Sequence, residues 1–94
     1  MELDVENASL GFLVARYLVY GYLYYIWDRP IVEDKTFDAI CRRLYREFDN
    51  VEHQHGYLLD RDALQAGTAY RLLDTDYPLI VRVIGHDILK GKTI

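Results

Sequence analysis

The chain has 94 residues, which corresponds to a single domain over residues 1–94, and its hydrophobic content of 51% is enough for a core rather than a disordered chain. A net charge of −4 argues against a surface that binds nucleic acid directly, because such a surface needs a basic stripe, and it leaves a basic protein partner open. The single cysteine, Cys41, excludes an intramolecular disulfide and fits a reducing cytosol.

The N-terminus is acidic, with Glu2, Asp4 and Glu6 where a secretory signal peptide would be basic, so we expect a cytoplasmic protein. From residue 10 to residue 27 the chain is almost entirely apolar or aromatic, with Arg16 as its one charge. This stretch is long enough to cross a membrane. The charge inside it, and tyrosines that need hydrogen-bond partners, favour a buried helix without membrane contact instead.

A helix that is apolar on nearly every face needs cover on several sides. One stripe is expected to pack on the next helix and includes Leu13, Tyr17 and Tyr24. A second stripe, turned away from the first, recurs every seven residues at Phe12, Val19 and Ile26. We expect this second stripe to form a protein interface, with a second copy of the chain as a homodimer or with another protein. The alternative is a monomer in which residues 79–89 cover it.

Asp28, Arg29 and Pro30 are expected to end the first helix, because proline cannot continue the helical hydrogen bonds. Asp34 is predicted to cap a second helix. The core face of this helix is marked by apolar residues at spacings of three and four: Phe37, Ile40, Cys41, Leu44 and Phe48. Its solvent face is expected to carry Arg42, Arg43 and Arg46. The short connection predicts an antiparallel helical hairpin over about residues 8–49.

The second half of the chain predicts short helices that cover the hairpin, at about residues 57–90. Residues 60–66 are typical of a helix that begins at a capping aspartate and ends at Gly67. Pro78 suits the first position of another helix over residues 79–89. The β-branched run from residue 80 to residue 84 is also compatible with a buried strand, but no clear partner strand is present, so we favour a helix. The predicted fold is therefore all-α.

The residues around the predicted turn also match a known pattern. The motif Tyr-(Tyr/His)-x-x-Asp-x-Pro-x-x-x-Asp-x-x-Tyr-Asp-x-Leu is filled here by Tyr24, Tyr25, Asp28, Pro30, Asp34, Phe37, Asp38 and Ile40. This stretch resembles the small N-terminal Ia domain of NAD-dependent DNA ligases, which is a helical hairpin. It is also similar to short ligase-related proteins of phages and prophages. The resemblance covers about a third of the chain well.

The resemblance implies a set of ligand contacts. In the ligases the equivalent positions hold the nicotinamide mononucleotide half of NAD, and here they are Tyr24, Tyr25, Asp34, Phe37 and Asp38. Aromatic faces attract a cationic nicotinamide ring, and carboxylates accept hydrogen bonds from ribose and carboxamide groups. Phe37 lacks the hydroxyl of the family's tyrosine, and Tyr25 stands where many ligases have histidine. The alternative is that these residues serve only as a cap, as packing and as cover for the hairpin.

Two other kinds of site are not expected. Ligases form a lysyl-adenylate at a Lys-x-Asp-Gly motif, which this sequence lacks, so we expect no enzyme activity. His53, His55 and His86 have no acidic cluster beside them, so we expect no metal site.

The leading functional prediction is a non-catalytic binding protein of phage or prophage type that acts through protein–protein interaction. Its partner would be a host or viral protein. Its action would be inhibition of a host enzyme or of a defence complex, as in an anti-CRISPR protein. The alternative prediction, from a different class, is a small-ligand module that binds nicotinamide mononucleotide or NAD and needs no other cofactor.

Overall fold

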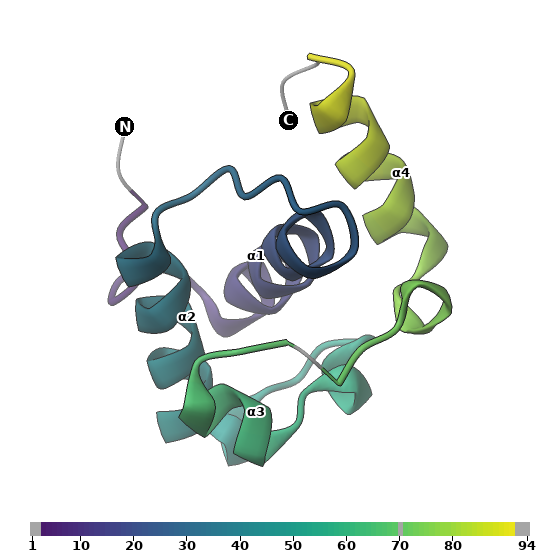
Figure 1. The fold of residues 1–94 in the computed structure, drawn as a ribbon. Helices are drawn as coiled ribbons and strands as arrows, with labels where there is room; N and C mark the ends of the chain where they lie inside the picture. Colours follow the sequence, from purple (N-terminus) through teal and green to yellow (C-terminus); the bar gives the residue numbers. More distant parts are fainter. Residues whose placement is uncertain (1–2, 70, 92–94) are drawn as a thin grey trace.

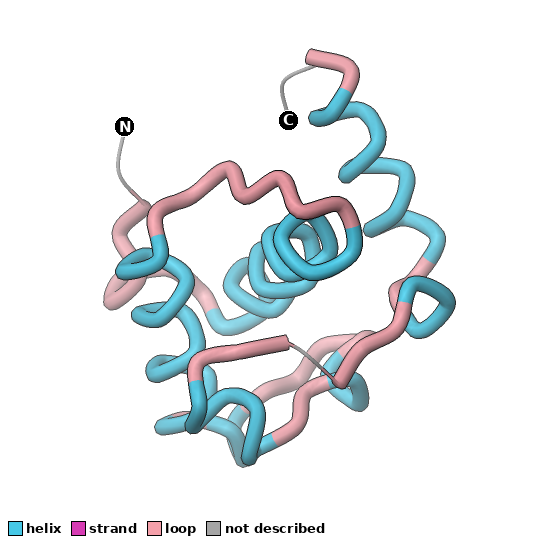
Figure 2. The backbone as a smooth tube through the Cα atoms, viewed as in Figure 1, coloured by secondary structure: helices cyan, strands magenta, loops and turns pink. Residues whose placement is uncertain are grey.

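The computed structural model describes residues 3–69 and 71–91, and every regular element within those ranges is helical (Figures 1 and 2). The α-helices of this part of the chain are α1 (Leu10–Gly21), α2 (Asp34–Arg46), α3 (Arg61–Ala66) and α4 (Leu79–Leu89). A π-helical turn, η1 (Tyr22–Ile26), continues α1, and 3₁₀ turns lie at η2 (Phe48–Asn50), η3 (Gly56–Leu58) and η4 (Asp74–Asp76). The all-α prediction is confirmed.

Helix α1 lies at the centre of the fold. It contacts α2 and α4, while α3 contacts α2. Figure 1 shows α1 almost end-on between α2 and α4, with α3 below. The connection after η1 returns the chain to α2 as a hairpin, with the axis of α2 steeply inclined to that of α1 in this view. The central position explains why buried side chains occur around α1: Leu13, Val14, Tyr17, Leu18, Val19 and Tyr20.

The first helix has a defined start and end. The hydroxyl of Ser9 caps it by accepting a hydrogen bond from the backbone N–H of Phe12 at 3.2 Å. At the other end Asp28 adopts a left-handed conformation with φ 53°, and the backbone N–H of Arg29 donates to the carbonyl of Leu23 at 2.8 Å. This closure resembles a Schellman motif widened by one residue, as the π turn requires. The helix therefore ends before Pro30, as predicted.

The start of α2 lies one residue earlier than predicted. Its N-cap is Glu33, whose extended backbone lets its carbonyl accept from the N–H groups of Thr36 and Phe37. Asp34 is the first helical residue, so the prediction that Asp34 is the N-cap is wrong. The predicted core face is confirmed, with four of its residues buried: Phe37, Ile40, Cys41 and Leu44. Phe48 lies beyond α2 in η2 and is half-buried.

Arg43 differs from the solvated residue that the sequence predicts. Its side chain is only 12% exposed, whereas those of Arg42 and Arg46 are 70% and 57% exposed. The Arg43 guanidinium pairs with Glu47 and donates to the backbone carbonyls of Val5 at 2.6 Å and Ala8 at 3.0 Å. One arginine thus holds the segment before α1 against α2, because its fork of donors satisfies several carbonyls at once.

The C-terminal half confirms both predicted helices. Asp60 caps α3 by accepting from the N–H of Asp62 at 3.0 Å, and Gly67 ends the helix with φ 74°. Residues 79–89 form α4, so the strand alternative is wrong. Pro78 is the N-cap of α4 rather than its first helical residue. The helix is favoured because one face of it, with Val81 and Gly85 buried, packs on α1 and η1.

Helix α4 approaches η1 closely at one point. A Cβ atom on Gly85 would lie 2.7 Å from Cδ2 of Tyr22, whose side chain is 1% exposed and cannot move aside. The hydroxyl of Tyr22 lies 3.2 Å from Nε2 of His86, and its ring meets that of Tyr77 edge-on at 5.2 Å. Glycine at position 85 is therefore what allows α4 to cover the buried tyrosine.

The stripe of Phe12, Val19 and Ile26 has mixed surroundings. Val19 is 4% exposed and Ile26 is half-buried, while Phe12 is 40% exposed with Arg16 over its ring at 4.6 Å. Ile84 of α4 lines a small apolar hollow together with Phe12 and Val19. Helix α4 thus covers part of this stripe and leaves Phe12 accessible. Among the described helices, none is long and apolar enough to cross a membrane.

Candidate functional site

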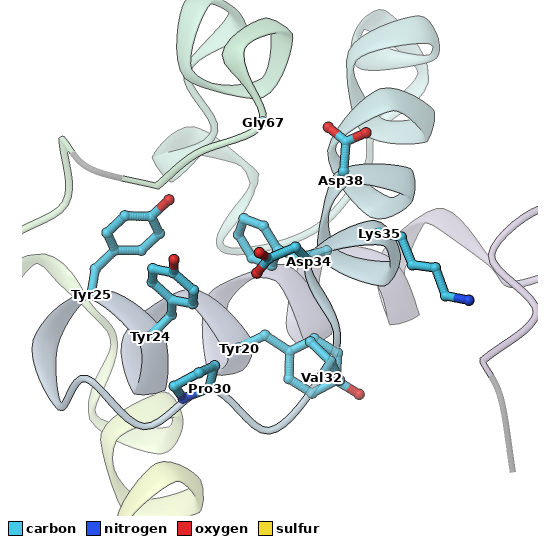
Figure 3. Close-up of a pocket in the computed structure, with 10 residues that line it drawn as sticks. Tyr20, Tyr24, Tyr25, Pro30, Val32, Asp34, Lys35, Asp38 and Gly67 are labelled. Atoms are coloured by element: carbon cyan, nitrogen blue, oxygen red, sulfur yellow. The ribbon is translucent and has the colours of Figure 1, made fainter.

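A pocket of about 410 Å³ opens where the end of η1, the connection to α2 and the end of α3 meet (Figure 3). Its aromatic side comes from η1 and α2, and its acidic side comes from the first turns of α2. Five residues that the sequence predicts as ligand contacts line it: Tyr24, Tyr25, Asp34, Phe37 and Asp38. The lining is completed by Tyr20, Pro30, Val32, Lys35 and Gly67.

The aromatic wall depends on the π turn. The rings of Tyr24 and Tyr25 lie 4.7 Å apart between centroids and are tilted by 44°, and the ring of Phe37 lies 6.5 Å from that of Tyr25. A π turn holds more residues per turn than an α-helix, so consecutive side chains diverge less and both tyrosines reach the same pocket. Tyr24 is 40% exposed, which leaves its ring available to a ligand.

The two carboxylates lie one helical turn apart on α2, so they share a face. Figure 3 shows the Asp34 carboxylate directed toward Tyr24 and the Asp38 carboxylate directed toward Gly67. Asp34 is exposed at the first position of the helix. Asp38 is 49% exposed and pairs with Arg42 at 2.7 Å along the helix. Both carboxylates therefore remain in contact with solvent and with anything that enters the pocket.

Gly67 meets two requirements at the rim of the pocket. Its φ of 74° is a left-handed conformation that residues with a side chain rarely adopt. A Cβ atom at this position would also lie 2.8 Å from Oδ1 of Asp38. The glycine that ends α3 therefore leaves room for the carboxylate that faces the pocket.

The titratable groups behind the aromatic wall favour their neutral forms. Burial raises the pKa of the Tyr25 phenol, and a backbone hydrogen bond with Ala69 lowers it in part. Burial also raises the pKa of Tyr17, whose hydroxyl donates to the carbonyl of Thr68 at 2.7 Å. Cys41 is buried, and desolvation followed by the nearby charge of Asp38 raises the pKa of its thiol to about 12. Cys41 is therefore a protonated, unreactive thiol at neutral pH.

The histidines do not gather into a metal site. The Nδ1 atom of His53 accepts a hydrogen bond from the backbone N–H of His55 at 3.0 Å. His86 lies apart from them on α4, where its ring packs against those of Trp27 and Tyr22. Within residues 3–69 and 71–91 there is no group of three or more histidine, cysteine, aspartate or glutamate residues that could hold a metal ion.

A family model of the DNA ligase-like, N-terminal NAD⁺-binding domain matches residues 8–63. The chain belongs to this family. The match spans α1, η1, α2 and the start of α3, and it includes all five predicted contacts. These 94 residues hold the N-terminal domain without the lysine motif of a ligase's catalytic domain, and nothing in the described residues indicates catalysis. Searches of the curated proteins and of the solved structures found no match.

Several lining residues of this family member were not predicted as contacts. Tyr20 lies four residues before Tyr24, so helical spacing places both on one face and could have indicated it. Lys35 and Val32 flank the start of α2. Gly67 lies outside the matched segment, and its sequence signal was a helix-ending glycine rather than a ligand contact. The pocket therefore combines the family hairpin with a residue from beyond it.

Proposed function

We propose that the chain binds the nicotinamide half of NAD, as nicotinamide mononucleotide or NAD itself, and that it does so without catalysing a reaction. The observation that carries this proposal is the convergence of the five family positions on one pocket. The volume of about 410 Å³ lies within the usual range for small-molecule sites. The same five residues could have pointed away from one another if they served only as cap and packing.

The chemistry of the pocket suits a nicotinamide cation. Its ring would stack in the open aromatic wall, with Tyr24 on its accessible side and Phe37 behind Tyr25, because aromatic faces attract cations. The Asp34 and Asp38 carboxylates would accept from the carboxamide and from the ribose hydroxyls. Phe37 is 8% exposed and stacks on Tyr17 at 5.5 Å, so its role is to support the wall.

The decisive experiment is an NMR titration of the full chain with nicotinamide mononucleotide and NAD. We expect shifts at the pocket residues, and we expect Tyr24→Ala and Asp38→Ala to abolish them while the fold is retained. Matched controls are Tyr57→Ala and Asp49→Ala, since both residues are exposed and lie outside the pocket. Unchanged spectra of the parent protein at millimolar nicotinamide mononucleotide, NAD and nicotinamide riboside would rule the proposal out.

A second candidate is the leading sequence prediction of a protein-interaction role. One observation in its favour is that Phe12 is exposed and lines a hollow with Val19 and Ile84. Another is that three apolar residues of α4 are exposed: Leu79, Ile80 and Val83. Exposed apolar side chains of this kind suit a protein interface, and a second copy of the chain is the partner to test. Light scattering over a concentration series should show a dimer that Phe12→Asp dissociates. A constant monomer mass would exclude self-association. Phage origin and inhibition of a host enzyme or defence complex stay predictions.

A further inference from the structure

We propose that the pocket selects a nicotinamide cation that carries no phosphate, so that nicotinamide riboside binds more tightly than nicotinamide mononucleotide. This inference rests on the proposed function and concerns which member of the ligand class the site prefers. It follows from the charges around the pocket and from the direction of its one lysine.

The lining is acidic on the side formed by the first turns of α2. Asp34 and Asp38 both face the pocket, and among the described residues that line it Lys35 is the single cation. The Lys35 ammonium lies 3.4 Å from the carboxylate of Glu33. Figure 3 shows its side chain extending away from Tyr24 and Tyr25. A phosphate on the ligand would therefore meet carboxylates before it met this ammonium group.

Arg42 does not reverse this balance. Its guanidinium lies 2.7 Å from Oδ2 of Asp38 but is not part of the pocket lining. It offsets the charge of Asp38 only in part, because the pair is exposed and water screens it. Glu33, Asp34 and Asp38 together place three carboxylates here, against the two cations Lys35 and Arg42.

One feature of the site favours an anion, and two acidic side chains of the chain oppose its effect. The start of α2 carries backbone N–H groups and the positive end of the helix dipole, which commonly bind phosphate. Here the first helical residue is Asp34 and the N-cap is Glu33, so two carboxylates of the chain lie at that end. Neither side chain makes a capping hydrogen bond, but the negative charge of both would oppose the approach of a ligand phosphate.

The two ligands differ in charge where the site is most sensitive. Nicotinamide riboside carries only the positive charge of its pyridinium ring. The mononucleotide adds a phosphate monoester with a charge of about −1.5 to −2 at neutral pH. The carboxylates on the acidic side of the pocket attract the riboside and repel the phosphate of the mononucleotide. We therefore expect a difference in Kd on the order of tenfold at low salt.

The test is a calorimetric titration of the full chain with both ligands at low and at high salt. We expect the riboside to bind more tightly, and added salt to weaken its binding, because screening reduces the attraction. The mononucleotide should bind more weakly and lose no affinity as salt is added. The neutral ligand nicotinamide should show no salt dependence. Mononucleotide binding that equals or exceeds riboside binding would overturn the charge selection and leave the proposed function intact.

Charge-neutral variants locate the cause. Asp34→Asn keeps the size of the side chain and removes one charge, so it should reduce the preference for the riboside several-fold. Asp49→Asn is the matched control, since Asp49 is 87% exposed in η2 and lies outside the pocket. An unchanged preference in Asp34→Asn would contradict the inference. Failure of both ligands to bind the parent protein would instead reject the proposed function itself.

Discussion

The π turn η1 directs its tyrosines into two different surroundings. Tyr22 is 1% exposed, with its ring against Tyr77 and against the space left by Gly85. Tyr24, two residues later, is 40% exposed and lines an open pocket with Tyr25. The same residue type thus serves as core on one face of the turn and as a candidate binding surface on the other.

Helix α2 shows the same division along its length. Leu44 is fully buried, whereas Asp34 at the other end is exposed in the pocket. The packed region, which we define by Tyr22, Leu44, Tyr77 and Gly85, should determine the free energy of unfolding. The pocket should determine binding and contribute little to stability, because its carboxylates are hydrated. Substitutions in the two regions should therefore have separable effects.

The largest expected effect is that of Leu44→Ala in the packed region. Leu44 is 0% exposed on α2, so its truncation leaves a cavity and should lower the free energy of unfolding by about 2–5 kcal/mol. Urea denaturation of the purified protein measures the change. Tyr57→Ala removes more atoms from a side chain that is 76% exposed and should change stability far less. Equal effects of the two substitutions would contradict the assignment of the core face.

Gly85→Ala tests the close approach of α4 to η1. The added Cβ would meet the buried Tyr22 ring at 2.7 Å, and overpacking of this kind costs about 1–3 kcal/mol. That cost exceeds the gain of about 1 kcal/mol from the higher helix propensity of alanine. Gly11→Ala in α1 is the control, since its Cβ would make only ordinary contact with His53 at 3.6 Å. Thermal melts should show Gly85→Ala below the parent and Gly11→Ala at or above it.

Much of this division could be predicted from the sequence, because it depends on local spacing. The spacing of apolar residues in α2 predicted its core face, and Pro30 predicted the turn of the hairpin. The π turn could not be predicted, since its apolar residues look the same in an α-helix. Arg43 was also missed, because its partners Val5 and Ala8 lie far from it in the sequence. Sequence patterns place a helix start only to within a residue or two, which explains why Asp34 was predicted as the N-cap in place of Glu33.

The candidate site was predictable to a similar extent. The motif identified Tyr24, Tyr25 and the α2 residues, and the hairpin predicted that they would meet. The contribution of Gly67 to the pocket lining could not be predicted, because it depends on where the end of α3 lies against α2. A local pattern predicts the glycine that ends α3, but no local pattern contains the short distance to Asp38 that also requires glycine here.

Gly67→Ala should therefore affect both stability and binding. A side chain in a left-handed conformation costs about 1–2 kcal/mol. The added Cβ would also lie only 2.8 Å from Oδ1 of Asp38, so the carboxylate would have to move. Gly91→Ala is the matched control, because Gly91 also has a positive φ, 87°, but has nothing within 4 Å of an added Cβ. Denaturation should show a stability loss in both variants. Titration with nicotinamide mononucleotide should show weaker binding only in Gly67→Ala. Equal binding in the two variants would contradict a role for Asp38 in the site.

The smallest expected effect on stability is that of Asp34→Ala. Asp34 follows the N-cap and makes no capping hydrogen bond, so only its favourable position near the helix dipole is lost, about 0.3–0.5 kcal/mol for an exposed carboxylate. Asp60→Ala is the comparison, since Asp60 caps α3 through the N–H of Asp62 and its loss should cost about 1 kcal/mol. The order reverses for binding, because Asp34 faces the pocket and Asp60 does not line it. If Asp34→Ala destabilises the protein more than Asp60→Ala and leaves ligand binding unchanged, the carboxylate is structural.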